Sequence, residues 1–335
     1  MKKKSLFMLV LASMALVTSC SSDDEGAKTS QEKGSPISFY TSVGSRAVET
    51  TTANLTEFQT YSFQEGQANY MDGISYKLSG GAWSTEAGTF YWPVTGDLHF
   101  YCYAPAAPGS EGVFTMNSTE QKVTGFVPYT TAATQQDFIF AQATGNLKGN
   151  GTSGIDLNFE HALSEITVQA KNANTAYTVE VTGVKLGNIT SKGDFTFPTV
   201  AGGDAAWSLG QDKSEYTTEW TTANKLTENA SALDESNVAF MLLPQQLEAE
   251  TKAIEGSYLA LKVKITMQGG KVVRDGWSYI ALATKWEMGK RYNYTVDFTS
   301  GAGQDEDGND IISGTSVKYN VTVTPWTPSK QDVNA

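Results

Sequence analysis

The chain has few of the residues on which most enzymatic and metal sites depend. Its 335 residues include two cysteines and two histidines, and neither His99 nor His161 has a second histidine or cysteine at metal-ligand spacing. The sequence contains no Gly-x-Ser-x-Gly elbow, no phosphate-binding glycine loop and no His-Glu-x-x-His pair. Carboxylates are plentiful, but no two stand out as an acid and base couple. We therefore expect a protein that is not an enzyme and holds no metal or other cofactor, with a polysaccharide-cleaving enzyme as a minor alternative.

Long apolar runs are scarce as well, and the N-terminal run is too short to span a bilayer. It covers residues 6–17, follows three lysines and leads through small or apolar residues into Cys20. This order is typical of a secretory signal and resembles the lipobox of bacterial lipoproteins. The acidic residues 23–25 resemble the surface-export signal of Bacteroides-type lipoproteins, or else form a solvated tether. We expect residues 1–19 to be a lipoprotein signal peptide and Cys20 to carry a lipid in the outer membrane.

The chain also has fewer basic than acidic residues, 24 against 36. The formal net charge is −12, and it falls to −15 once the three lysines of the signal are removed. Such acidity argues against nucleic acid and against an anionic membrane surface as partners. If Cys20 is lipidated, Cys102 has no cysteine left to pair with, so no disulfide within the chain is possible. A large hydrophobic core must then hold the fold, and about 300 mature residues can supply one, most simply as two domains.

The sequence is rich in strand patterns. Short runs of valine, isoleucine, threonine, tyrosine and phenylalanine alternate with polar residues, and glycine, asparagine, aspartate and proline separate them. The clearest runs are residues 37–43, 98–103, 165–169, 177–181, 258–265, 292–298 and 317–323. Helical spacing is scarce. This pattern predicts an all-β protein built from β-sandwiches.

A stretch dense in glycine and asparagine, residues 145–154, is typical of a linker or a long loop. Each half of the chain around it holds a comparable set of strand patterns. We expect residues 20–46 to form a lipidated tether and a propeptide strand. Residues 47–156 would form an N-terminal β-sandwich domain, and residues 157–335 a C-terminal one.

Several motifs occur in an order that resembles the fimbrillin families of Bacteroidetes, the FimA-like and Mfa-like pilins. They are Phe90-Tyr-Trp-Pro93, Leu98-His-Phe-Tyr-Cys-Tyr-Ala-Pro105, Asp137-Phe-Ile-Phe-Ala141, Leu157-Asn-Phe-Glu-His-Ala-Leu-Ser-Glu-Ile-Thr-Val168, Trp286-Glu-Met-Gly-Lys-Arg-Tyr-Asn-Tyr294 and Val317-Lys-Tyr-Asn-Val-Thr-Val-Thr-Pro-Trp326. The resemblance implies two transthyretin-like Greek-key β-sandwich domains in tandem. It also implies export as a lipoprotein and cleavage by an arginine-specific protease after the first strand. A strand of another pilin subunit would then fill the vacated groove.

The first strand pattern has the properties that this scheme needs. Residues 37–43 place Ile37, Phe39, Thr41 and Val43 on one face. A propeptide strand with Ile37, Phe39 and Val43 in the core would leave an apolar groove when removed.

An arginine follows this strand in a segment of small residues. Arg46 precedes Ala47, and an extended, flexible loop of this kind is accessible to proteases. The other two arginines, Arg274 and Arg291, fall at strand edges far along the chain. We expect processing between Arg46 and Ala47, although without the family resemblance Arg46 reads as an ordinary surface residue in a turn.

The C-terminal pattern is the candidate donor strand. Val317, Tyr319, Val321 and Val323 alternate as an inserted strand requires, but the same pattern fits the last strand of the chain's own sandwich. In that second case the protein would be a tip-located or stand-alone surface adhesin for a host glycan or protein.

The acidic residues 305–310 upstream of this strand resemble a calcium-binding loop. The spacing of the acidic residues and the flanking strands favour a turn instead.

Overall fold

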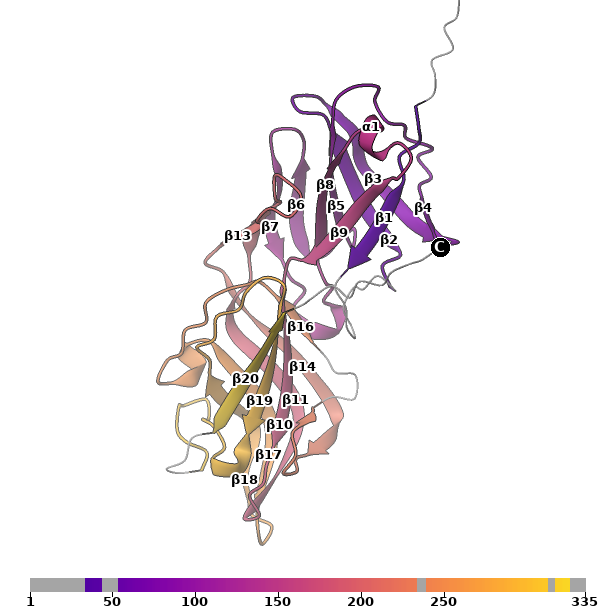
Figure 1. The fold of residues 1–335 in the computed structure, drawn as a ribbon. Helices are drawn as coiled ribbons and strands as arrows, with labels where there is room; N and C mark the ends of the chain where they lie inside the picture. The colour runs from indigo at the N-terminus through magenta and orange to yellow at the C-terminus, as the bar shows by residue number, and fades with distance from the viewer. Residues whose placement is uncertain (1–33, 44–53, 234–238, 313–316, 326–335) are drawn as a thin grey trace, which may run out of the picture. The chain divides into compact units, whose positions relative to one another are not determined.

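The computed structural model describes residues 34–43, 54–233, 239–312 and 317–325 (Figure 1). Strands make up most of these residues. Within the described ranges, helical structure is limited to the short helix α1 (Leu147–Asn150) and the 3-10 turns η1 (Ala132–Thr134), η2 (Ala253–Glu255) and η3 (Phe298–Ser300). The predicted all-β fold of β-sandwich type is confirmed.

The first sheet has seven strands in the order β1-β9-β8-β5-β2-β3-β4. Their bounds are β1 Phe39–Val43, β2 Glu57–Phe63, β3 Asn69–Ser79, β4 Ala82–Ser84, β5 Leu98–Ala104, β8 Ile139–Gly145 and β9 Ile155–His161. The strand β1 pairs parallel with β9, and every other neighbouring pair is antiparallel. β1, the first described strand along the chain, therefore lies at one edge of the sheet. Its neighbour there is β9, the strand of this sheet that comes last along the chain.

This sheet curls around a hydrophobic core. Phe39 in β1 and Tyr76 in β3 have ring centroids 4.8 Å apart, although four strands lie between β1 and β3 in the sheet order. The edge strand β1 thus approaches β3, near the opposite edge of the sheet, across the core. We call this set of buried side chains the first core; Phe58, Leu98, Phe100, Cys102, Ile139, Ile155, Leu157 and Phe159 belong to it.

A second sheet covers the other face of the central strands. Its order is β13-β12-β7-β6, with β6 Glu111–Met116, β7 Gln121–Val127, β12 Gly193–Thr196 and β13 Ala206–Leu209. Between the two sheets lies a phenylalanine-rich core to which Tyr101 and Tyr103 of β5 contribute. Alternate residues of β5 thus face different cores, which explains why its sequence is apolar almost without interruption.

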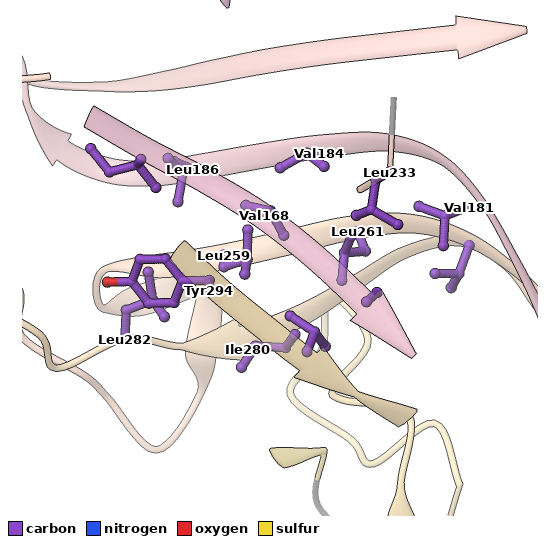
Figure 2. Close-up of a cluster of buried hydrophobic side chains, with 14 of the residues drawn as sticks. Val168, Val181, Val184, Leu186, Leu233, Leu259, Leu261, Ile280, Leu282 and Tyr294 are labelled. Carbon is purple, nitrogen blue, oxygen red and sulfur yellow. The ribbon is translucent and has the colours of Figure 1, made fainter. Parts of the chain in front are cut away.

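The remaining strands form a sandwich of two sheets. One has the order β15-β10-β19-β20 with β16 also paired to β10, and the other has the order β14-β11-β17-β18. Their bounds are β10 Ser164–Lys171, β11 Tyr177–Thr190, β14 Lys213–Lys225, β15 Ser231–Ala232, β16 Phe240–Leu242, β17 Tyr258–Met267, β18 Val272–Ala281, β19 Lys290–Asp297 and β20 Lys318–Pro325. Figure 2 shows the core between them, where Val168, Leu259 and Tyr294 come from three different strands.

Strand pairing crosses the boundary that the sequence suggests at residue 156. β9 is a single strand that spans this residue, and β12, at residues 193–196, pairs with β7. Residues 145–154 connect the antiparallel strands β8 and β9 through α1, where the Asn146 side chain accepts a hydrogen bond from the backbone N–H of Gly149 at 2.8 Å. This segment is therefore a long loop within one sheet. The division into residues 47–156 and 157–335 stays a prediction.

The connection from β9 to β10 is very short. β9 ends at His161 and β10 begins at Ser164, and the two linking residues, Ala162 and Leu163, are buried.

Candidate functional site

The position of β1 is the candidate site, and we call the space that β1 fills the β1 slot. On one side β1 pairs with β9, and Ile155 donates its backbone N–H to the Ser38 carbonyl oxygen at 2.9 Å. On the other side, Ile37 donates its backbone N–H to the Phe90 carbonyl at 2.9 Å, and Trp92 donates to Ser35 at 3.0 Å. The residues just before β1 thus have backbone partners on the side away from β9, whereas β1 itself pairs with β9 at the edge of the sheet.

The floor of the β1 slot is the first core. Phe39 is 5% exposed, and its ring packs edge-on against Phe58, Tyr76 and Phe100 at centroid distances of 5.8, 4.8 and 5.6 Å. Val43 is fully buried, Ile37 is 8% exposed and Thr41 is half-buried. The inward side chains of this strand are thus integral to the first core.

The opposite face of β1 is polar and open. Tyr40 is 57% exposed. The Ser42 hydroxyl donates a hydrogen bond to the Asn158 side-chain oxygen of β9 at 2.6 Å. Ser42 and Asn158 lie opposite each other in the β1–β9 pairing, so this hydrogen bond forms only when the two strands are in this register.

The strand β20 lies at an edge of its sheet and is much less buried than β1. It pairs antiparallel with β19. Val317, Tyr319 and Val321 are half-buried against the core, while Val323 is 48% exposed. A hollow of about 220 Å³ is lined by Val317 and Tyr319 together with residues of β18, which belongs to the other sheet of the sandwich. The four residues predicted for the donor strand therefore sit in their own sandwich, but loosely.

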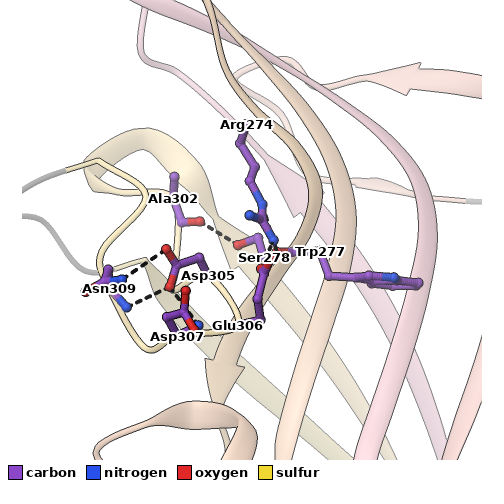
Figure 3. Close-up of polar contacts among 8 residues, drawn as sticks. All are labelled: Arg274, Trp277, Ser278, Ala302, Asp305, Glu306, Asp307 and Asn309. Atoms are coloured by element: carbon purple, nitrogen blue, oxygen red, sulfur yellow. Dashed lines mark hydrogen bonds and ion pairs between the residues drawn. The ribbon is translucent and has the colours of Figure 1, made fainter.

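Two of the three arginines are held in strands. The guanidinium of Arg274 in β18 donates to the Trp277 carbonyl oxygen and pairs with the Glu306 carboxylate (Figure 3). Arg291 in β19 pairs with Glu165 of β10. The predicted lipidation residue Cys20 and the processing pair, Arg46 and Ala47, lie outside the described residues.

The acidic loop that begins at Asp305 is organised by its own hydrogen bonds. One carboxylate oxygen of Asp305 accepts the backbone N–H groups of Asp307 at 3.0 Å and Asn309 at 2.8 Å (Figure 3). The hydrogen bond from the Asn309 backbone is the main reason that the pKa of Asp305 is lowered. The carboxylate thus serves as a turn former. Across the described ranges, no three histidine, cysteine, aspartate or glutamate side chains are grouped so that they could hold a metal ion.

A buried cluster of titratable side chains, which no sequence motif indicates, lies near the β9–β10 connection. His161 Nδ1 is 2.9 Å from Asp137 Oδ2, and both side chains are almost fully buried. Burial, with a contribution from the charge of Asp137, raises the pKa of Glu165 to about 8. Asp137 and His161 are 24 residues apart and lie on neighbouring strand ends, so no local spacing pattern could have linked them.

Taken together, the described residues form a strand-built protein in which the first strand completes a core and the last strand lies loosely at an edge. The fimbrillin-like family matches residues 45–326, and the chain belongs to this family. The resemblance inferred from the sequence motifs is thereby confirmed. No curated protein matches the sequence.

The chain is similar to several solved structures. A fimbrial protein from Bacteroides vulgatus is 16% identical, with a TM-score of 0.58 over 87% of this chain and 99% of that one. A protein described as a cell adhesion protein, from Bacteroides uniformis, is 18% identical, with a TM-score of 0.49 over 87% and 98%. The fimbrial anchor protein Mfa2 from Porphyromonas gingivalis is 11% identical, with a TM-score of 0.33 over 87% and 98%. None of the helices in the described part of the chain has the length and apolar character to cross a membrane.

Proposed function

We propose that this chain is a structural subunit of a cell-surface fimbrium and not an enzyme. It is exported as a lipoprotein, anchored in the outer membrane through Cys20 and cut between Arg46 and Ala47. A strand of another pilin subunit then replaces β1. The observation that carries this proposal is the burial of Ile37, Phe39 and Val43 in the first core, on a strand that precedes the proposed cut.

The energetics favour replacement over an empty slot. Burying three large apolar side chains contributes roughly 5–9 kcal/mol, at about 1.5–3 kcal/mol each. Removing the chain up to Arg46 also leaves unpaired the backbone groups of β9 that bond to this segment and those of Phe90 and Trp92 that bond to Ile37 and Ser35. An incoming strand restores both the apolar contacts and the hydrogen bonds, as in other cases of strand addition. Subunits joined in this way are expected to separate very slowly.

The environment of the other arginines supports a single cut. A protease must draw its substrate into an extended form, and Arg274 and Arg291 lie within paired strands and make ion pairs. Cleavage at either position would require a sandwich strand to unfold. An arginine-specific protease should therefore leave the body of the protein intact.

A second function is favoured by the pairing of β20 with β19. Because the last strand occupies a place in its own sandwich, the described chain needs no partner to complete this sheet. That arrangement suits a tip-located or stand-alone surface adhesin that binds a host glycan or protein.

The test is limited proteolysis of the full chain carrying Cys20→Ser, which prevents lipid addition. After treatment with an arginine-specific protease, we expect an N-terminus at Ala47 and a ladder of SDS-resistant oligomers. The matched control is Arg46→Lys, which keeps the positive charge but removes the recognised residue and should leave a monomer. A chain that starts at Ala47 and stays monomeric would contradict the assembly proposal and favour the adhesin.

A further inference from the structure

A hollow of about 610 Å³, which we call the end hollow, lies at one end of the first sheet. β2 begins there at Glu57, and β5 ends there at Ala104. Gln136 and Asp137, which lead into β8, line it together with Tyr129. Because β5 pairs antiparallel with both β2 and β8, the three chain segments meet at the same end of the sheet. Resting on the surface-adhesin function named above, and independently of strand exchange, we propose that the end hollow binds an uncharged pyranose ring of a glycan.

The lining of the end hollow combines the polar and apolar groups that a sugar needs. Thr56, Glu57 and Gln136 are exposed and offer a hydroxyl, a carboxylate and an amide. Sugar hydroxyls both donate and accept hydrogen bonds, and a side-chain amide does the same. Tyr129, which is half-buried, and the apolar residues 105–107 supply surface for the C–H face of a pyranose. The volume is in the range of small-molecule sites.

The charges around the end hollow argue against an acidic ligand. Among the described residues, none that lines it is lysine, arginine or histidine, so a sugar carboxylate or sulfate finds no charged partner. The Glu57 carboxylate repels an anion and accepts a hydrogen bond from the Ser75 hydroxyl at 2.6 Å. The Asp137 carboxylate is almost fully buried and lies 2.9 Å from His161 Nδ1, so it is shielded from a cationic ligand. An uncharged ligand therefore fits this site best.

The position of the end hollow argues against an extended peptide. β2, β5 and β8 each have a paired strand on both sides. The hollow lies at the ends of these strands, where they offer no free sheet edge to an added strand. A compact ligand is therefore favoured over a strand of another protein.

The wall that carries Tyr129 is held in place by contacts outside the end hollow. The Gln135 side-chain amide donates a hydrogen bond to the Tyr129 carbonyl oxygen at 2.8 Å, and its oxygen accepts the backbone N–H of Met241 at 2.7 Å. Ala132, in the turn η1 between Tyr129 and Gln135, is buried in the core of the sandwich to which β10 and β11 belong. A wall that is already ordered loses less conformational freedom when a ligand binds.

A glycan array tests the ligand class. The protein is the full chain carrying Cys20→Ser and Arg46→Lys, which is expected to remain an uncleaved monomer. The array pairs glycans that end in a neutral sugar with the same glycans capped by sialic acid, and it includes mammalian and bacterial glycans to separate the two sources of such rings. We expect binding to neutral glycans, with at least about tenfold weaker binding to their sialylated counterparts.

Variants of the same chain test the site. Tyr129→Ala should weaken binding about tenfold, and Tyr129→Phe, which keeps the ring, should retain it. Gln136→Ala, at an exposed position, should weaken binding about threefold to tenfold without affecting the fold. The matched control is Tyr40→Ala, which removes an exposed tyrosine that does not line the end hollow and should leave binding unchanged. Thermal melts show whether each variant is folded.

Each result decides a separate point. A neutral glycan bound equally well by Tyr129→Ala and Gln136→Ala would overturn the end hollow as the site but leave the adhesin function standing. A preference for the sialylated glycans would overturn the uncharged ligand. Binding to no glycan would overturn this proposal as a whole. The adhesin function would then depend on binding to host proteins, and the SDS-resistant ladders of the cleaved chain decide the pilin function separately.

Discussion

Replacing Phe39 by alanine is the most direct probe of what β1 contributes to the fold. The side chain is 5% exposed and packs edge-on against three rings of the first core. Losing a buried phenylalanine side chain costs about 3–5 kcal/mol, which includes the cavity left behind. The neighbouring Tyr40 is 57% exposed on the same strand, so Tyr40→Ala should cost less than about 0.5 kcal/mol.

Hydrogen exchange read by mass spectrometry can follow the opening of β1 locally. The backbone N–H of Ile155 in β9 bonds to Ser38, and this bond breaks when β1 leaves. In Phe39→Ala we expect the protection of residues 155–159 to fall by about 10²- to 4 × 10³-fold, since each 1.4 kcal/mol is a factor of ten. Protection that falls equally in Phe39→Ala and Tyr40→Ala would refute the claim that the inward face holds this strand.

Three further predictions concern the same cores. Burial raises the pKa of the Cys102 thiol to about 12, so in the chain carrying Cys20→Ser a disulfide reagent at about pH 8 should label Cys102 at least about 100-fold more slowly when the chain is folded than when urea unfolds it; equal rates would contradict this burial. Although Arg291 pairs with its carboxylate, burial raises the pKa of Glu165 from 4.5 to about 8, so the stability linked to protonation of Glu165 is complete below about pH 4 and is lost as the pH rises to about 8. Glu165→Gln should then flatten the fall of the urea midpoint between about pH 5 and pH 8, and an unchanged slope would speak against it. Gly34→Ala brings a methyl group within 2.8 Å of the Trp92 carbonyl oxygen and should lower stability by about 1–3 kcal/mol in thermal melts, whereas Ser38→Ala, at an exposed position, should not.

The sequence pattern predicts well those features that depend on alternation within one strand. In residues 37–43 the period of two indicates which side chains point inward, and Ile37, Phe39 and Val43 are indeed buried. Thr41 is only half-buried, because alternation indicates a face and not the depth at each position. The order of motifs along the chain was enough to identify the family.

Pairing between distant strands could not be derived in the same way. The strand β12 pairs with β7, and β1 approaches β3 across the first core. The local sequence pattern of a strand indicates which side chains share a face, but it does not indicate which other strand lies beside it. The buried pair of Asp137 and His161 is hidden for the same reason, since it depends on two strand ends meeting in space. Residues 145–154 look like a linker because turn residues are common to all connections, including those within a sheet.

The short connection between β9 and β10 has a mechanical consequence. In a fibre built by the proposed exchange, tension enters a subunit through the strand lodged beside β9 and passes along the main chain into β10. It then crosses the seven residue pairs between β10 and β19 and continues along the main chain toward β20, the candidate donor strand. Strands pulled along their length load many hydrogen bonds at once, and such pairs resist force far better than pairs peeled apart one bond at a time. Because only two buried residues, Ala162 and Leu163, connect β9 to β10, this connection can lengthen very little under tension.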